Sequence, residues 1–280
     1  MGALGHTAAA KCFHDGGSEF DVHMAYLSAS AQNEQELPYG NIVAQNEHAA
    51  FLHYQFQDRA KPTETKSLLI DAGGSYRGYA SDITRSHVID TASTGNEAHA
   101  LFSELLTDMQ SHQDQLVNAV TPGCSYLELQ QTMHQQLAHI LSTRGVLTCS
   151  AEEAFEQHLT EAFCPHGLGH LLGLQVHDVG GQQITADGQL CPPPENYPAL
   201  RFTRPITANM VLTVEPGLYF IPSLLEPYRD AHPAFNWSLL DALYPFGGIR
   251  IEDNVRVLPT GSENLTRNAF STIASADNTP

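Results

Sequence analysis

The sequence lacks any long apolar run. No stretch reaches the roughly 18 consecutive apolar residues that mark a membrane-spanning helix. Residues 1–17 also lack the basic start and apolar segment of a secretory signal peptide. We therefore expect no membrane partner and a cytoplasmic location.

Basic residues are scarce. Lys and Arg number 13 against 31 Asp and Glu, which gives a formal net charge of −18. A surface of this sign repels nucleic-acid phosphates and anionic lipids, so we expect neither as a partner. The excess of carboxylates, together with 15 histidines, is what a cation site requires.

The five cysteines are widely spaced and form no Cys-x-x-Cys pair. This pattern favours neither a disulfide scaffold nor a thiolate zinc site, and it agrees with a reducing compartment. The chain does have size and apolar content, with 280 residues of which 42% are hydrophobic. That is enough for a single domain over residues 1–280 with a substantial core.

Helical patterns come in pairs. They lie over residues 2–14, 18–32, 97–120, 126–140 and 152–163. Ser18 and Asp21 form a capping box at the start of the second helix, and we expect Ser125 and Glu128 to cap the fourth.

Strand patterns alternate with these helices. They lie over residues 41–45, 67–71, 83–90, 211–214, 217–221 and 248–258. The order predicts an α+β domain in which helix pairs cover one face of a curved, antiparallel-type sheet. Residues 181–209 are rich in Pro and Gly and predict a long loop, which in a compact domain usually has a function.

Four acidic residues stand at the ends of apolar strand patterns: Asp71, Asp82, Glu215 and Glu252. A carboxylate buried at a strand end costs free energy unless a cation lies beside it. Taken alone, each Asp could equally be a turn or cap residue, but the coincidence of all four favours a common site.

Three histidines, His166, His170 and His177, follow one another in a Gly-rich segment and are typical of ligands, although polar loop histidines are the alternative. Carboxylates with an imidazole favour Mn²⁺, Mg²⁺, Co²⁺ or Fe²⁺ over a thiolate-type zinc site. Four carboxylates balance two divalent ions. Two such ions roughly 3.5 Å apart lower the pKa of a bridging water and polarise a carbonyl, so the residues indicate metal-assisted hydrolysis.

Four motifs follow in a fixed order: Asp71 and Asp82 separated by ten residues, His-Gly-Leu-Gly-His170, Val-Glu215-Pro-Gly and Arg250-Ile-Glu252-Asp-Asn. In this order they resemble the pita-bread metallopeptidases, which comprise methionine aminopeptidase, aminopeptidase P, prolidase and creatinase. The runs 39–48, 52–54, 173–178 and 244–250 are similar to the bacterial Xaa-Pro dipeptidase (prolidase) branch. The resemblance covers residues 2–268 and implies the pita-bread fold.

The resemblance implies a dinuclear metal site. Its ligands would be Asp71, Asp82, His170, Glu215 and Glu252, with Asp82 and Glu252 bridging the two ions. Mn²⁺ is the expected metal, with Co²⁺ or Fe²⁺ as alternatives. Arg250 would hold the metal-binding carboxylates in place.

The resemblance also implies roles in catalysis. Glu215 would take a proton from the attacking water and pass it to the leaving nitrogen. His177 would hydrogen-bond the substrate carbonyl, His53 would assist in binding, and His166 would support the reaction from outside the ligand set. Arg201 would bind the C-terminal carboxylate, although Arg204 is close enough to exchange roles with it.

The implied reaction is hydrolysis of Xaa-Pro dipeptides. Their tertiary amide has no N–H, and the Arg201 clamp would limit substrate length. A side activity on organophosphorus esters is a further expectation, because a tetrahedral phosphorus resembles the tetrahedral intermediate. The resemblance leaves a homodimer open.

Prolidases of this kind carry an N-terminal domain that this chain lacks, so we expect the catalytic domain alone, as a natural short form or a trimmed piece. Aminopeptidase P activity on longer peptides is one alternative, and a form inactive without the N-terminal domain is another. Non-catalytic pita-bread binding modules lose metal ligands, and creatinase-like hydrolases need no metal; the complete ligand set argues against both.

Overall fold

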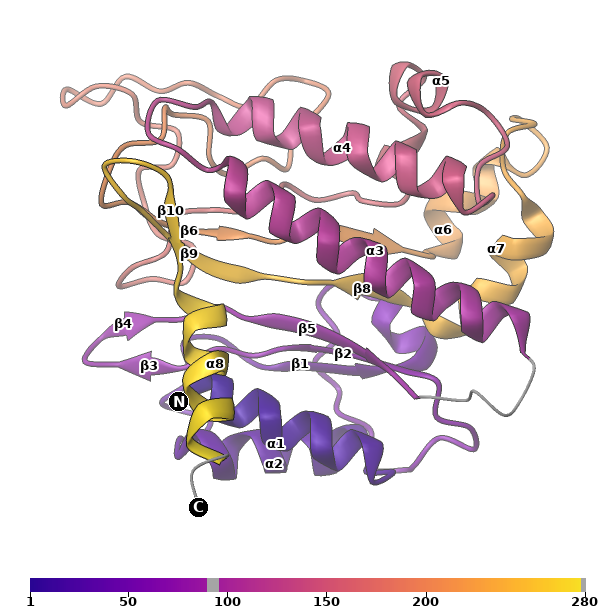
Figure 1. Ribbon diagram of the computed structural model, residues 1–280, viewed down its shortest axis with the longest axis horizontal. Coiled ribbons are helices and arrows are strands. Elements are labelled where there is room, and N and C mark those ends of the chain that lie inside the picture. The colour runs from indigo at the N-terminus through magenta and orange to yellow at the C-terminus, as the bar shows by residue number, and fades with distance from the viewer. Residues whose placement is uncertain (90–95, 278–280) are drawn as a thin grey trace.

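The strands form a layered centre between two helix pairs, as Figure 1 shows. The computed structural model describes residues 1–89 and 96–277. The α-helices are α1 (Gly2–His14), α2 (Glu19–Ser30), α3 (Glu97–Ala119), α4 (Tyr126–Thr143), α5 (Ala151–Glu156), α6 (Pro222–Leu225), α7 (Trp237–Leu243) and α8 (Leu265–Asp277). Short 3₁₀ helices are η1 (Asn46–Ala50), η2 (Leu159–Ala162), η3 (Glu226–Tyr228) and η4 (Tyr244–Phe246).

The strands pair antiparallel. They are β1 (Ile42–Gln45), β2 (Ser67–Asp71), β3 (Ser75–Tyr76), β4 (Tyr79–Ala80), β5 (Thr84–Val88), β6 (Val211–Val214), β7 (Gly217–Tyr219), β8 (Gly248–Arg250), β9 (Asp253–Val257) and β10 (Ser262–Asn264). One sheet has the order β1-β2-β5 and another β10-β9-β6, with β3-β4 and β7-β8 as two-stranded pairs. An isolated bridge between Thr84 and Glu252 joins the two halves of the chain.

Each helix pair buries an apolar face against its own part of the sheet. Helices α1 and α2 pack on β1 and β2 through Phe13, Tyr26 and Ile70. Helices α3 and α4 cover β6 and β9, with Met133 and Leu212 fully buried in the larger cluster. Burying each such side chain contributes about 1.5–3 kcal/mol, so both pairs are anchored to the strands that carry the candidate site.

The expected α+β architecture is confirmed, with differences in detail. The capping box of Ser18 and Asp21 forms at the start of α2. The predicted cap at Ser125 is wrong, because the residue takes the N-cap position of α4 without a side-chain capping bond. Its backbone instead forms a bridge to Pro205 of the long loop.

Two predicted elements are each divided in the structure. The helix expected over residues 152–163 ends at Glu156 and resumes as η2, because His158 takes a left-handed φ of 57°. The strand expected over residues 248–258 becomes β8 and β9, with Ile251 and Glu252 between them. Glu252 therefore lies outside the regular strand pairing of β8 and β9.

The remaining strands match the predictions closely. Strand β5 ends at Val88, and residue 90 of its predicted range lies outside the described residues. Residues 181–209 contain no helix or strand, although Gln183 and Leu190 form a bridge there. The sequence patterns missed β3, β4, β10 and helices α6 to α8. None of the helices in the described part of the chain has both the length and the apolar content to cross a membrane.

Candidate functional site

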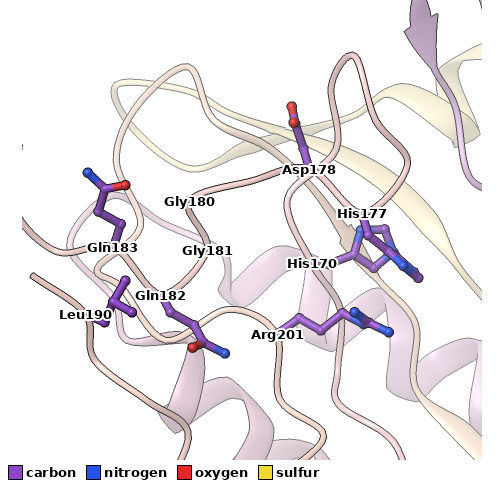
Figure 2. A pocket seen from close by; sticks show the side chains of 9 residues that line it. All are labelled: His170, His177, Asp178, Gly180, Gly181, Gln182, Gln183, Leu190 and Arg201. Carbon is purple, nitrogen blue, oxygen red and sulfur yellow. The ribbon is translucent and has the colours of Figure 1, made fainter. Parts of the chain in front are cut away.

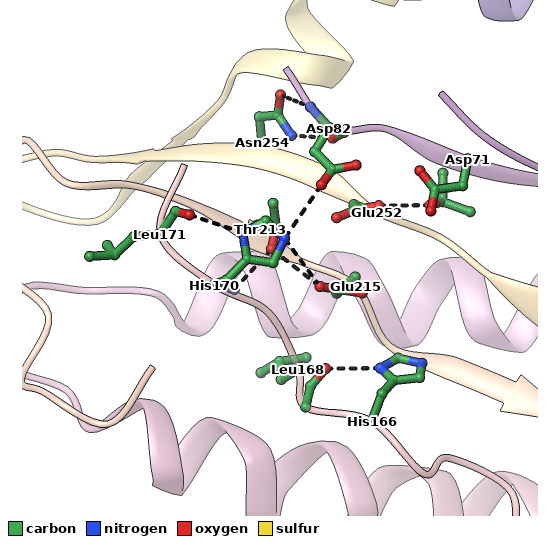
Figure 3. Close-up of polar contacts among 12 residues, drawn as sticks. Asp71, Asp82, His166, Leu168, His170, Leu171, Thr213, Glu215, Glu252 and Asn254 are labelled. Atoms are coloured by element: carbon green, nitrogen blue, oxygen red, sulfur yellow. Dashed lines mark hydrogen bonds and ion pairs between the residues drawn. The ribbon is translucent and has the colours of Figure 1, made fainter. Parts of the chain in front are cut away.

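Four carboxylates and one imidazole converge between the two halves of the chain (Figure 3). Asp71 is the last residue of β2, and Asp82 precedes β5. Glu215 follows β6, and Glu252 occupies the gap between β8 and β9. His170 comes from the Gly-rich segment after η2. The structure thus brings together all five residues that the sequence predicted as metal ligands.

The distances suit a shared cation. His170 Nε2 lies 3.4 Å from Asp82 Oδ2 and 3.6 Å from Glu215 Oε1. One donor atom each of Asp82, His170 and Glu252 lies within 4.8 Å of the other two. His170 Nδ1 is 2.9 Å from the carbonyl oxygen of Leu171, so the ring donates there, and loss of the Nε2 proton would free that nitrogen for a cation.

Asp71 is held from two sides. Arg250 Nη2 donates to Asp71 Oδ2 at 2.6 Å, as the sequence predicted for a residue that positions the carboxylates. Tyr39 Oη lies 2.7 Å from Asp71 Oδ1 and 2.6 Å from Asp82 Oδ1. A hydroxyl has one proton, so Tyr39 cannot donate to both carboxylates at once. The metal-free centre therefore contains more acceptors than donors.

Glu252 is the least satisfied of the four carboxylates. Thr84 Oγ1 donates to its Oε2 at 2.7 Å, whereas its Oε1 is buried and has no hydrogen-bond partner among the described residues. A buried acceptor without a partner is costly. A cation at this point would satisfy it, so the residues present fit a divalent metal.

The protonation equilibria agree with a site that favours a cation. Burial is the main cause that raises the pKa of Asp71 to about 6, raises that of Glu215 to about 7, and raises that of Glu252 well above its ordinary value. Burial also acts on Asp82, but the hydrogen bond and charge of His170 outweigh it and lower the pKa of that carboxyl. Each raised pKa reports the cost of burying another negative charge here.

His166 lies next to this centre and is connected to it through Tyr219. His166 Nε2 is 2.9 Å from Tyr219 Oη, which accepts a hydrogen bond from Arg250 Nη1 at 2.8 Å. Burial lowers the pKa of His166 to about 4, so the ring is neutral. This position outside the donor set is the one that the sequence predicted for His166.

A pocket of about 320 Å³ opens beside His170 (Figure 2). It is lined by His170, His177, Asp178, Gly180, Gly181, Gln182, Gln183, Leu190 and Arg201. The rings of His170 and His177 meet edge to face with centroids 4.4 Å apart. The structure therefore places His177 and Arg201 in one pocket at the candidate centre, and Arg201 rather than Arg204 lines it.

His53 is exposed on the segment between η1 and β2. Burial lowers the pKa of His177 to about 4, and the positive charges of His170 and Arg201 act in the same direction, as does His53 more weakly. His53 is therefore close enough to the pocket to affect the pKa of His177. Its predicted part in substrate binding remains a prediction.

Sequence reasoning did not assign the residues that support the donor set. Tyr39, Thr84 and Tyr219 bind the carboxylates or their arginine, and Asn254 Oδ1 accepts from the backbone N–H of Asp82 at 3.0 Å. Tyr39 stands in one of the runs that carry the resemblance, and Asn254 follows the Glu252 motif directly. The others have no local sequence signal, since their partners lie far along the chain.

The helix pairs, the antiparallel strands and the buried oxygen-rich donor set are those of the pita-bread fold with a metal centre. The chain belongs to metallopeptidase family M24, whose sequence profile matches residues 1–259. The family is one of metallopeptidases, and Asp82, His170 and Glu252 form a candidate metal site here.

Known relatives cover nearly the whole chain. It is 46% identical over 266 residues to the Xaa-Pro dipeptidase of Yersinia enterocolitica, and 46% identical over 270 residues to that of Salmonella arizonae. These alignments cover 94% and 95% of this chain but 59% of each relative.

Solved structures show the same fold. Zn-substituted Escherichia coli aminopeptidase P in complex with product superposes with a TM-score of 0.73 at 27% identity, over 100% of this chain and 57% of that one. The same enzyme with the inhibitor Pro-Leu gives a TM-score of 0.73 at 26% identity, over 99% of this chain and 57% of that one.

Proposed function

We propose that this chain forms the catalytic part of a metal-dependent Xaa-Pro dipeptidase. The observation that carries the proposal is the convergence of four carboxylates, of which Asp82 and Glu252 are buried, and His170 beside a pocket lined by His177 and Arg201. The names of the 46% identical relatives support the same substrate class.

In this proposal the five converging residues hold two divalent ions. Asp71, Asp82, His170, Glu215 and Glu252 would hold these ions. Mn²⁺ is the proposed metal, with Co²⁺ or Fe²⁺ as alternatives, because these hard donors favour all three. When bound, the ions polarise the scissile carbonyl and lower the pKa of a water.

The remaining steps belong to side chains of this chain. Glu215 accepts the proton of the attacking water and delivers it to the proline nitrogen as the amide breaks. His177 hydrogen-bonds the carbonyl oxygen as it gains negative charge. The planar guanidinium of Arg201 binds the free C-terminal carboxylate with two parallel hydrogen bonds and so selects dipeptides.

The proposal extends to the surroundings of the enzyme. All five cysteines are free thiols, which supports a reducing cytoplasm. A homodimer and a side activity on organophosphorus esters belong to the same proposal. We include the side activity because the tetrahedral phosphorus of such an ester can occupy the place of the tetrahedral carbon formed during peptide hydrolysis.

Aminopeptidase P activity is the second candidate. It is favoured by the structural likeness to the Escherichia coli enzyme at 27% identity. An aminopeptidase P would break the Xaa–Pro bond at the N-terminus of longer peptides, so its site would not require a free carboxylate directly after proline. The dipeptide clamp that we assign to Arg201 is the feature that separates the two.

The test is a titration of the metal-stripped chain with Mn²⁺, with release of the N-terminal alanine compared between Ala-Pro, which leaves proline, and Ala-Pro-Ala, which leaves Pro-Ala. We expect hydrolysis of Ala-Pro to appear as two ions bind per chain, counted by elemental mass spectrometry. Preference for Ala-Pro-Ala would favour the aminopeptidase. Two bound ions with neither peptide cleaved would overturn the proposed activity for this chain, but not the metal centre.

A further inference from the structure

One side of the pocket beside His170 has no part in the reaction described so far. It is built by residues 182–191 of the long loop, which fold back on themselves and which we call the pocket hairpin. Gln183 and Leu190 form an antiparallel bridge within it. Two backbone hydrogen bonds flank this bridge at 2.9 and 2.8 Å, from Ile184 to Gln189 and from Cys191 to Gln182. Such a pair of residues lies close together, with both side chains on the same face of the hairpin.

That face is turned toward the pocket. Gln183 and Leu190 both line it, and in Figure 2 they stand on the side opposite His170. Side chains alternate between the two faces of a strand, so Ile184 and Gln189 belong to the other face. Neither of them lines the pocket. The hairpin therefore presents Leu190 to a bound substrate and keeps Ile184 away from it.

Leu190 gives this side of the pocket its apolar character. Among the described residues that line the pocket, it is the one with an aliphatic side chain, and it is 62% exposed. Its neighbour Gln183 donates through Nε2 to the carbonyl oxygen of Thr185 at 2.9 Å, so that amide group is held by the hairpin itself. An apolar group of a ligand that covers Leu190 removes both surfaces from water, which favours binding.

The base of the hairpin is tied to the segment that carries Arg201. The carbonyl oxygen of Gly181 accepts hydrogen bonds from the backbone N–H groups of Thr203 and Arg204, at 3.0 and 3.1 Å. A Cβ at Gly181 would lie 2.5 Å from the carbonyl oxygen of Arg201, so a residue with a side chain could not approach so closely. Leu190 and Arg201 thus belong to one connected unit, which offers an apolar contact and a guanidinium to the same ligand.

We propose that Leu190 is a specificity-determining residue that contacts the pyrrolidine ring of the substrate while Arg201 binds the carboxylate on the same proline. The inference rests on the proposed function and deepens it. Ring and carboxylate share the proline Cα, so a side chain and a guanidinium from one unit can contact both. Selection of proline then depends on an apolar contact as well as on the tertiary amide at the scissile bond.

The first test measures binding and needs no turnover. L-Proline and sarcosine (N-methylglycine) are titrated into the Mn²⁺-loaded chain by calorimetry. Both compounds carry a secondary amine and a carboxylate, but sarcosine lacks two methylene groups of the ring. Burial of one methylene group is worth roughly four-fold in affinity, so we expect the native chain to prefer proline by roughly four-fold or more.

Three variants assign this preference to a residue. In Leu190→Ala we expect it to fall below about two-fold, because alanine cannot reach the ring. Leu190→Met keeps the side-chain volume and should retain the preference. Ile184→Ala is the matched control from the other face and should also retain it. Circular dichroism checks that each variant is folded. A native chain without preference for proline, or a folded Leu190→Ala chain that keeps the native preference, would overturn the contact.

The second test uses the proposed activity. Ala-Pro and Ala-sarcosine, which both present a tertiary amide, are compared as substrates of the same chains. Leu190→Ala should raise KM for Ala-Pro by roughly four-fold with little change in kcat, because the contact is made equally before and during the reaction. KM for Ala-sarcosine should stay nearly constant. An equal rise for both substrates would overturn the contact with the ring. If none of the chains cleaves Ala-Pro, the dipeptidase proposal fails, and the binding preference alone decides the role of Leu190.

Discussion

The metal centre and the wall of the neighbouring pocket are built in opposite ways. The centre consists of carboxylates at strand ends together with His170, and Asp82, His170 and Glu252 are each at most 5% exposed. The wall carries His177 and Arg201, which are exposed and lie on loops. Strands fix a donor set in advance, whereas loops let recognition residues adjust to a substrate.

The two regions also differ in how their charges are balanced. Carboxylates of the centre are shielded from water, so they need a cation or a proton. Charges of the wall are exposed and screened by solvent. Changes in the centre should therefore affect catalysis and the stability of the metal-free protein, whereas a change at Arg201 in the wall should affect substrate affinity alone.

The largest effect is expected from Glu215→Gln. This change removes both a proposed ligand and the proposed proton acceptor while keeping the side-chain shape. We expect turnover of Ala-Pro to fall by roughly 10³-fold. Steady-state kinetics at saturating Mn²⁺, with metal content measured in parallel, checks this. Activity within ten-fold of the native chain would remove Glu215 from the mechanism.

Arg201→Ala tests the wall. Loss of a charge-assisted hydrogen-bond pair of about 2 kcal/mol should raise KM for Ala-Pro by roughly 30-fold and leave turnover nearly unchanged. Arg204→Ala is the matched control and should change KM little, because Arg204 does not line the pocket. If the control has the larger effect, the two arginines exchange roles.

Glu252→Gln tests the buried charge of the centre through the stability of the metal-free protein. Its carboxylate has a buried oxygen without a partner and a pKa raised mainly by burial. The neutral amide should stabilise the metal-free protein by about 2 kcal/mol against urea. Mn²⁺ should raise the free energy of unfolding of the native chain by at least this amount, and it should not do so for the variant. A variant less stable than the metal-free native chain would contradict the charge argument.

The smallest effect concerns pH. Burial raises the pKa of Asp71 from 3.8 to about 6 and that of Glu215 from 4.5 to about 7, so the folded metal-free chain binds more protons than the unfolded one between these values. Stability present at low pH is therefore lost as pH rises through this range. We expect the free energy of unfolding to fall between pH ~5 and ~7.5.

Saturating Mn²⁺ should reverse this trend, because protons compete with the ion for the same oxygens. Urea unfolding at several pH values, with and without Mn²⁺, measures both curves. A metal-free protein that grows more stable as the pH rises through this window would refute the assigned direction.

A feature could be predicted from the sequence when the residues that cause it lie close together in the chain. The capping box of Ser18 and the strand-end carboxylates are local patterns, so they were predicted correctly. The break at His158 was not, because its left-handed conformation leaves no mark in helical periodicity. The division of residues 248–258 was missed as well, since an apolar run does not show that Glu252 pairs with Thr84 instead of a ladder neighbour.

The supporting residues of the site show the same limit. Arg250 was assigned through the resemblance, but Tyr39 and Thr84 were not, because their meaning comes from partners far along the chain. Only the folded chain shows that one tyrosine hydroxyl faces two carboxylates. Spacing within a motif can predict a ligand, but it cannot predict what holds that ligand in place.

The links between the two halves of the chain have a consequence for synthesis. Thr84 and Glu252 are 168 residues apart, and Asp71 and Arg250 are 179 apart. A ribosome must therefore complete nearly the whole chain before the last donor can reach the first. From the synthesis of Asp82 until that of Glu252 the two aspartates lack these partners, so the complete donor set forms only as the final strands arrive.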